Sequence, residues 1–324
     1  MKAIVYRRNG SPDVLEYEEI EKPTPGDGEV LVKVRAASIN PLDWRLMRGL
    51  PVVLRFMVGM GRLKVERPGV DLAGEVEGVG RNVTRFKAGD AVFGACKGAF
   101  AEYGCAAESR LALKPDTVTF EQAASVTVAA VTALQGLRDK GKLQPGQRVL
   151  INGSSGGVGT FAVQIARSFG AHVTGVCSTR NVEMVRSLGA DQVIDYTRED
   201  FTRMSARYDL ILDSVGNHSA ATLRRLLTTN GICVIVGGPK GPWPMMRFLT
   251  TSVLGAVVLS RFVSQTLLSF IARVDPEVLD SLGALMKAGS VVPVVDRTYK
   301  LSEIRDAMRY AEEGHTRGKV VLTV

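Results

Sequence analysis

The pattern of hydrophobic and polar positions changes near residue 115. Before that point, short stretches such as Glu29–Ala37 and Gly74–Val79 alternate between the two kinds of residue, and turns rich in proline and glycine separate them. Alternation with a period of two predicts half-buried β-strands, so residues 2–115 are expected to form a mostly β domain. Glu121–Lys140 is expected to be helical and to lead into a second pattern.

After residue 147, short apolar runs alternate with segments of helical period. The runs predict strands at 148–152, 171–178, 192–196, 208–215 and 231–238, and the segments between them predict helices at 158–169, 181–188 and 219–229. Near-continuous apolar strands that alternate with helices are typical of a parallel sheet covered on both faces. The sequence therefore predicts an α/β protein with a Rossmann-type, doubly wound parallel sheet, which binds ligands at the carboxyl ends of its strands.

The first strand of this sheet ends in a glycine-rich turn that opens directly into a helix. Gly153, Gly156 and Gly159 stand at a Gly-x-x-Gly-x-x-Gly spacing. Free N–H groups at a helix N-terminus attract an anion, and residues without Cβ atoms let it come close. We expect Ser154, Gly156, Gly157 and Val158 to hold the phosphates of a dinucleotide. The alternative is a tight turn without a ligand, but the strand–turn–helix context favours the dinucleotide.

The end of the second predicted strand bears on the choice of cofactor. NAD sites place an acidic residue there for the ribose hydroxyls, whereas no Asp or Glu occurs between Gly159 and Glu183. The strand ends instead in Ser178, Thr179 and Arg180, which suit a 2′-phosphate and so favour NADP(H). The alternative is that Thr179 or Asn181 only caps the next helix and that Arg180 is solvated.

Composition narrows the class of protein further. A chain of 324 residues is expected to form two domains, and its net charge of +8 comes without a long basic run, so no nucleic-acid partner is expected. A positive field would help to attract an anionic cofactor. The four cysteines, at 96, 105, 177 and 233, form no C-x-x-C pair, and no signal-peptide pattern precedes the strand predicted at Lys2–Tyr6. Both observations favour a reducing compartment, and we expect a cytoplasmic protein.

Several segments together resemble one known family. They are Ala37–Asp43 with its Asn-Pro-x-Asp pattern, Pro68–Gly74, Phe86–Gly94, Gly98–Tyr103, the glycine turn Gly153–Gly159 and Gly314–Leu322. The chain is similar to the zinc-independent, quinone oxidoreductase-like family of medium-chain dehydrogenases/reductases. This resemblance implies a GroES-like catalytic domain from residues 1–120 and 290–324, a Rossmann NADP-binding domain at 121–289, an active site between them, and a homodimer.

The residue types make a catalytic metal unexpected. Where zinc-dependent relatives carry a cysteine, this chain has Asn40 or its neighbours, and where they carry Gly-His-Glu it has Gly69–Val70–Asp71. A catalytic zinc needs three protein ligands with one position open, and the three histidines, at 172, 218 and 315, stand in no ligand pattern. The reaction is therefore expected to proceed without a Lewis acid.

The resemblance then implies hydride transfer from NADPH to a quinone or an α,β-unsaturated carbonyl. It places Asn40 near the nicotinamide as a hydrogen-bond donor to the acceptor and lets Lys319 and Tyr196 contact the cofactor. The alternatives are a turn residue before a proline for Asn40, a solvated side chain for Lys319 and core packing for Tyr196. Asp43 is expected to be structural rather than a proton donor. Other possible functions are a metal-free alcohol or aldehyde dehydrogenase and a non-catalytic NADPH-binding protein.

Two apolar segments, at 51–60 and 248–272, depart from the simplest form of the family. Arg261 interrupts the second one, so no membrane span is expected. A buried core helix or a dimer interface would explain these segments. The sharper hypothesis is a wall for a lipophilic acceptor or a peripheral contact with a membrane.

Overall fold

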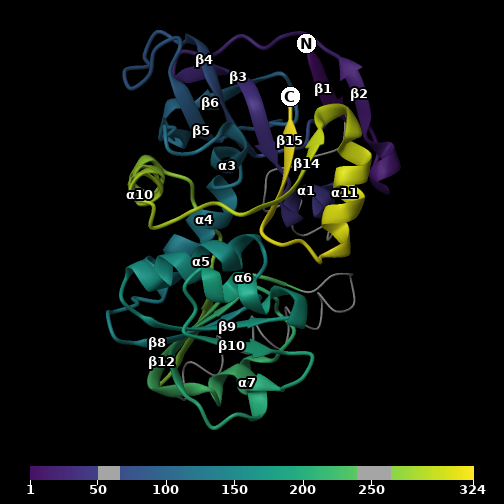
Figure 1. Ribbon diagram of the computed structural model, residues 1–324. Coiled ribbons are helices and arrows are strands. Elements are labelled where there is room, and N and C mark those ends of the chain that lie inside the picture. The colour runs from purple at the N-terminus through teal and green to yellow at the C-terminus, as the bar shows by residue number, and fades with distance from the viewer. Residues whose placement is uncertain (50–65, 239–263) are drawn as a thin grey trace. The chain divides into compact units, whose positions relative to one another are not determined.

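The computed structural model describes residues 1–49, 66–238 and 264–324, which form two compact units. Unit 1 comprises Met1–Val131 together with Val274–Val324, and unit 2 comprises Thr132–Arg273. Figure 1 shows the elements of each unit.

Unit 1 is built on a mostly antiparallel sheet of seven strands in the order β14-β15-β3-β4-β5-β7, with β6 paired to β3. Its strands are β1 (Lys2–Val5), β2 (Glu16–Glu19), β3 (Glu29–Ser38), β4 (Asp71–Val79), β5 (Ala91–Ala95), β6 (Tyr103–Ala107), β7 (Leu111–Leu113), β14 (Val295–Lys300) and β15 (Lys319–Thr323), of which β1 and β2 form a separate pair. The helices are α1 (Pro41–Met47), α3 (Phe120–Ala124), α4 (Thr127–Leu134, which crosses into unit 2), α10 (Pro276–Lys287) and α11 (Ile304–Glu313).

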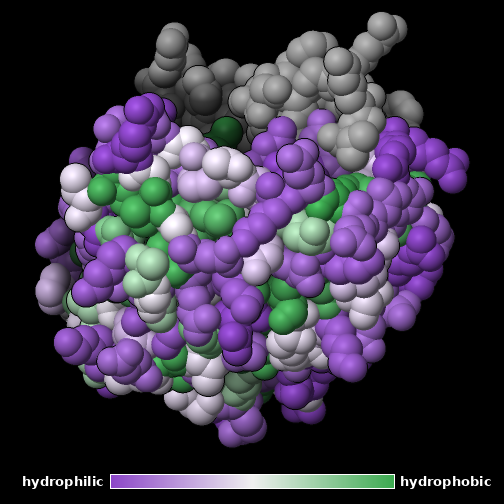
Figure 2. Space-filling model, turned by 90° about the horizontal axis from the view of Figure 1, so that it is seen from above, coloured by the Kyte–Doolittle hydropathy of each residue, from purple (hydrophilic) through white to green (hydrophobic). Residues whose placement is uncertain are grey.

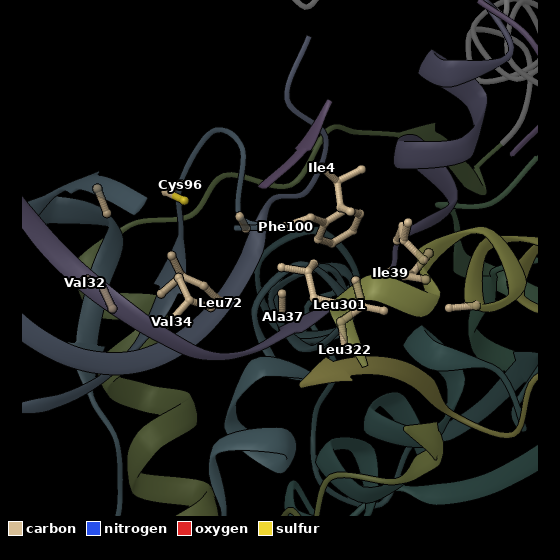
Figure 3. Packing of buried hydrophobic residues seen from close by; sticks show 14 of the residues in the cluster. Ile4, Val32, Val34, Ala37, Ile39, Leu72, Cys96, Phe100, Leu301 and Leu322 are labelled. Atoms are coloured by element: carbon tan, nitrogen blue, oxygen red, sulfur yellow. The ribbon is translucent and has the colours of Figure 1, made fainter. Parts of the chain in front are cut away.

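The core of unit 1 follows from the alternation seen in the sequence. Val30, Val32 and Val34 of β3 are buried at every second position, and the lysine between the last two is exposed. Figure 3 shows this core, in which Phe100 lies close to Ile4. Segments from both ends of the chain contribute to it, so the C-terminal residues complete the sheet that the N-terminal residues begin.

Unit 2 contains a parallel sheet of six strands in the order β10-β9-β8-β11-β12-β13. The strands in its described residues are β8 (Arg148–Asn152), β9 (His172–Cys177), β10 (Gln192–Asp195), β11 (Tyr208–Asp213), β12 (Leu227–Ile235) and β13 (Thr266–Ser269), and the described α-helices that lie wholly in this unit are α5 (Gly157–Ser168), α6 (Val182–Ser187) and α7 (Ala220–Arg224). Figure 1 shows α5 and α6 on one side of this sheet and α7 on the other. The chain reverses its winding between β8 and β11, where doubly wound sheets bind ligands.

Two elements of unit 2 differ from the prediction. The helix expected at 219–229 ends at Arg224, because the chain enters β12 at Leu227 and pairs there with β11. Part of the apolar stretch 248–272 was expected to be a core helix or a dimer interface. Thr266–Ser269 is not helical but forms the edge strand β13 beside β12, and the dimer interface stays a prediction. Residues 51–60 and 248–263 lie outside the described residues.

The boundaries of the units also differ from the predicted domains at 120/121 and 289/290. Helix α3 packs against β3 and β4, and α10 packs against β7, so both helices belong to unit 1. The division therefore falls after Val131 and before Val274.

The described helices include none that is long and apolar enough to cross a membrane. Figure 2 shows one face of the molecule, on which hydrophobic residues occur in small groups among hydrophilic ones. Small groups of this kind are ordinary on protein surfaces. The predicted membrane contact through residues 51–60 and 248–263 stays a prediction, because those residues are not described.

Candidate functional site

The glycine turn of unit 2 opens onto the N-terminus of a twelve-residue helix, as predicted. Gly153 has a φ of 83°, which reverses the chain after β8, and Gly156 is the N-cap of α5. Among the described residues, a Cβ atom added at Gly156 would meet only Gly153 O, at 3.5 Å, so no described side chain fills the space in front of the helix. The first N–H groups of a helix have no partner within it. Gly157 and Val158 thus present donors to an anion at an accessible place.

The same turn is tightly packed behind the helix. A Cβ atom at Gly159 would lie 2.1 Å from Gly153 O and 2.6 Å from Ser154 Cα, so this position accepts only glycine. Ser154 is buried, and both its backbone N–H and its hydroxyl donate to Val176 O, each at 3.0 Å. Ser154 therefore uses both its donors to hold the turn against β9.

The end of β9 carries a hydroxyl and carboxylate cluster that the sequence did not reveal. Thr179 Oγ1 donates to Asp195 Oδ2 at 2.5 Å and lies 2.9 Å from Thr197 Oγ1. The parallel pairing of β10 with β9 sets Asp195 opposite Cys177, which brings this acid beside Thr179. The hydrogen bond from Thr179, followed by those from Thr197, lowers the pKa of Asp195, so this carboxylate is ionised at neutral pH.

The other residues predicted to bind the cofactor at the ends of β9 and β10 differ in their exposure to solvent. Arg180 is exposed, and Ser178 is partly buried. Tyr196 is 57% exposed, so the alternative that it packs in the core is wrong. The capping part of the other alternative is wrong for both side chains: Thr179 donates to Asp195, and Asn181 makes no cap hydrogen bond but donates to Ser155 Oγ at 3.0 Å and to Ser178 Oγ at 3.2 Å. The exposure of Arg180 agrees with the solvated side chain of that alternative. Asn181 thereby joins the glycine turn to the end of β9.

Asp213 is a second group that the sequence did not reveal, and it lies where the winding of the sheet reverses. Asp213, at the end of β11, is fully buried, and its Oδ1 accepts from Asn152 Nδ2 at 2.8 Å and from the N–H groups of Val215 and Gly216, each at 3.1 Å. Its Oδ2 has no hydrogen-bond partner among the described residues. The sequence signal that could have revealed Asp213 is an acidic residue at the end of an apolar strand. Asp213 orders the loop that follows β11.

In unit 1, Asn40 and Lys319 meet in a buried polar cluster. Lys319 Nζ is 2.6 Å from Asn40 Oδ1 and 3.4 Å from Asp71 Oδ2, and the three residues are 4%, 3% and 0% exposed. Asp71 Oδ2 also accepts from Asn40 Nδ2 and Ser38 Oγ, each at 2.9 Å. The alternative that Lys319 is a solvated residue is therefore wrong. Burial lowers the pKa of the Lys319 ammonium, and the carboxylates of Asp71 and Asp43 oppose this shift.

Asp43 stands beside this cluster at the start of α1. Its Oδ2 accepts from the backbone N–H of Asn40 at 2.7 Å, which holds the turn before the helix. Burial raises the pKa of Asp43 to about 7, and the negative charge of Asp71 adds to this effect. The hydrogen bond supports the predicted structural role, while the raised pKa makes the charge of this group depend on pH near neutrality.

We expect Asp43→Asn to flatten the pH dependence of stability. The folded pKa of about 7 lies above the ordinary value of 3.8, so the unfolded chain releases this proton first, and the free energy of unfolding falls as the pH rises from about 4 to about 7. A shift of about three units corresponds to at most about 4 kcal/mol. Urea unfolding should give similar stability for both proteins at pH 4 and a more stable variant at pH 8. The exposed Asp27→Asn should keep the wild-type slope, and a wild-type slope in Asp43→Asn would contradict the prediction.

Comparison with known proteins identifies the family. Residues 26–116 match the family model of the alcohol dehydrogenase GroES-like domain, and residues 188–322 match that of the zinc-binding dehydrogenases. The chain is 32% identical over 339 residues to a chloroplast envelope quinone oxidoreductase homolog of Arabidopsis thaliana, covering 99% of this chain and 98% of that protein. The chain belongs to the quinone oxidoreductase-like family of medium-chain dehydrogenases/reductases. The predicted fold, a GroES-like domain with a Rossmann-type sheet, is confirmed.

Two further relatives of this family carry names that mention the cofactor. An NADPH-dependent alkenal/one oxidoreductase from chloroplasts of Arabidopsis thaliana is 34% identical, covering 99% of this chain and 79% of that protein. The crystal structure of Escherichia coli quinone oxidoreductase complexed with NADPH is 25% identical, with a TM-score of 0.84 and full coverage of both chains.

The family model that matches residues 188–322 carries zinc in its description, which makes the donor set of this chain relevant. Among residues 1–49, 66–238 and 264–324, no group of three His, Cys, Asp or Glu side chains is placed to hold a metal ion. The expectation of a metal-free reaction continues to rest on the residue types, with an amide at Asn40 and an aliphatic side chain at Val70.

Proposed function

We propose that this quinone oxidoreductase-like protein is an NADPH-dependent oxidoreductase that reduces quinones or α,β-unsaturated carbonyls. The observation that carries the proposal is the open glycine turn at the N-terminus of α5, in a chain of this family. Such a turn offers N–H donors and the positive end of a helix to a pyrophosphate. Membership of the family then indicates the reaction in which a bound dinucleotide would take part.

The residues of unit 2 divide into those that contact the cofactor and those that hold the site. Gly156, Gly157 and Val158 bind the pyrophosphate through the open start of α5. Ser178, Thr179, Arg180 and Tyr196 lie at the end of β9 and β10 and bind the adenosine end, where the guanidinium of Arg180 pairs with the 2′-phosphate. Ser154 supports the turn from behind.

The side-chain amide of Asn40 is the group that donates a hydrogen bond to the acceptor. When bound, NADPH would supply a hydride from C4 of its nicotinamide. A conjugated acceptor takes this hydride at carbon, and negative charge develops on its carbonyl oxygen. A hydrogen-bond donor placed at that oxygen stabilises the charge. Solvent supplies the proton that completes the product, since Asp43 is engaged with the backbone of Asn40.

Turnover of a conjugated acceptor tests this function. NADPH oxidation should be followed with a naphthoquinone, with a conjugated alkenal and with the saturated aldehyde of the same length. We expect the conjugated compounds to react at least about tenfold faster than the saturated aldehyde, because an ordinary carbonyl needs stronger polarisation than one amide donor gives, and neither a metal nor a Tyr–Lys pair is assigned here. Equal rates would favour the metal-free alcohol or aldehyde dehydrogenase. NADPH binding without any turnover would favour the non-catalytic alternative.

The proposal extends to the cellular setting. The four cysteines form no disulfide, which supports a reducing compartment, and the cytoplasm is the predicted one. A homodimer is the predicted assembly, and sedimentation of the purified protein tests it.

A further inference from the structure

Lys319 has as many acceptors around it as it has hydrogens to donate. An ammonium carries three donors and no acceptor. Lys319 Nζ lies 2.6 Å from Asn40 Oδ1, 3.0 Å from Ile39 O and 3.4 Å from Asp71 Oδ2. Its side chain is 4% exposed. The donors of Lys319 are therefore used inside unit 1.

These contacts leave one orientation for the amide of Asn40. Its oxygen faces the ammonium of Lys319, which can only donate, and its nitrogen lies 2.9 Å from the carboxylate of Asp71, which accepts. Turning the amide over would set nitrogen against the ammonium and oxygen against the carboxylate. Burial makes such mismatched polar contacts costly.

The sheet of unit 1 determines where Asp71 lies. Asp71 begins β4 and pairs in register with Ser38 at the end of β3, whose hydroxyl donates to Asp71 Oδ2. The backbone N–H of Val128 donates to the other oxygen, Oδ1, at 3.1 Å. Ser38 also pairs in register with Val321 of β15, the strand that begins at Lys319. Three strands and the start of α4 thus fix both groups that contact the Asn40 amide.

We propose that Lys319 and Asp71 are positioning residues that hold the amide of Asn40 in one orientation for the acceptor. The second hydrogen on Asn40 Nδ2 has a long contact of 3.5 Å to Ser38 O, which is a weak interaction. This hydrogen donates to the acceptor oxygen when substrate is bound. The inference rests on the proposed function and assigns Lys319 to Asn40 rather than to the cofactor.

Substitutions at Lys319 separate these two roles. Lys319→Met removes all three donors, whereas Lys319→Gln has a side chain of the same length as methionine and keeps a donor for Asn40 Oδ1. We expect Lys319→Met to lower kcat at least about tenfold with the Kd for NADPH within about twofold of wild type, and Lys319→Gln to retain more activity. The control is Asp90→Ala, which removes another hydrogen bond of unit 1, from the backbone N–H of Lys87 to Asp90 Oδ2 at 2.9 Å in the turn before β5. It should lower stability without lowering kcat.

A second readout does not depend on activity. The side-chain amide signals of Asn40, identified by their loss in Asn40→Ser, should exchange slowly with solvent in wild type and in Asp90→Ala, and faster in Lys319→Met. A large loss of NADPH affinity in Lys319→Met with kcat unchanged would overturn the inference, as would unchanged exchange. If wild type reduces no conjugated acceptor, the proposed function fails, while the exchange rates still decide whether Lys319 holds Asn40.

Discussion

Gly159→Ala is expected to destabilise unit 2 and to abolish tight NADPH binding. The added methyl group would lie 2.1 Å from Gly153 O and 2.6 Å from Ser154 Cα, and both are backbone atoms that cannot move without distorting the turn. Overpacking a well-packed site costs about 1–3 kcal/mol, and contacts this short with backbone atoms put Gly159→Ala at the upper end of that range. The melting temperature should fall by on the order of 10 °C, as a thermal scan would measure.

Gly156→Ala provides the matched control in the same turn. Within the described part of the chain its methyl group meets only Gly153 O, at 3.5 Å, and its φ of −84° suits alanine. Stability should therefore stay within about 1 kcal/mol of wild type. The methyl group would project into the space that the phosphates approach, so the Kd for NADPH should rise about tenfold in a fluorescence titration. Wild-type NADPH affinity in Gly156→Ala would place the pyrophosphate elsewhere.

The parts of the fold that could be predicted are those whose signal is local. Strands β8 to β11 lie within two residues of their predicted ends, because each is a short apolar run bounded by turn residues. The helix predicted at 219–229 failed at its end, where Leu227 enters a strand through pairing with β11. Strand β13 has only four residues within a long apolar stretch, so its pairing with β12 leaves no distinct pattern in the sequence.

In the candidate site, too, the sequence could predict individual residues but not the contacts between them. Resemblance pointed to Asn40 and Lys319 separately, but 279 positions separate them along the chain, and only the antiparallel pairing of β15 with β3 brings them together. Asp71 was noted as a departure from zinc-dependent relatives, and its position between Ser38 and Lys319 depends on strand register. No local pattern encodes such a contact.

Among the groups that the sequence did not reveal, Asp195 has the largest expected effect on cofactor binding. The absence of an acid at the end of β9 favoured NADP(H), yet β10 supplies a carboxylate 2.5 Å from Thr179 Oγ1. Its oxygens accept from Thr179, from Thr197 Oγ1 at 2.7 Å and from Thr197 N at 3.0 Å. These donors occupy the carboxylate within the protein. We infer that its negative charge weakens the binding of a 2′-phosphate, while Arg180 strengthens it.

Arg180→Ala and Asp195→Asn should therefore change NADPH binding in opposite directions. Losing a charge-assisted pair costs about 1.5–3 kcal/mol, so Arg180→Ala should raise the Kd for NADPH about tenfold to a hundredfold and change the Kd for NADH about twofold at most. Asp195→Asn should lower the Kd for NADPH about twofold to fivefold, a small effect because Arg198, whose Nε lies 3.5 Å from Asp195 Oδ2, already balances part of this charge.

Parallel fluorescence titrations with both cofactors measure these changes, and high salt should reduce the effect of Asp195→Asn. Arg186→Ala removes an exposed arginine that pairs with Glu183 on α6 and should leave both affinities unchanged. Equal losses for NADPH and NADH in Arg180→Ala would show that the guanidinium does not contact the 2′-phosphate. A higher Kd for NADPH in Asp195→Asn would show instead that this carboxylate supports the site by holding Thr179. The two variants thus separate the effect of the negative charge of Asp195 from the effect of the hydrogen bonds that its carboxylate accepts.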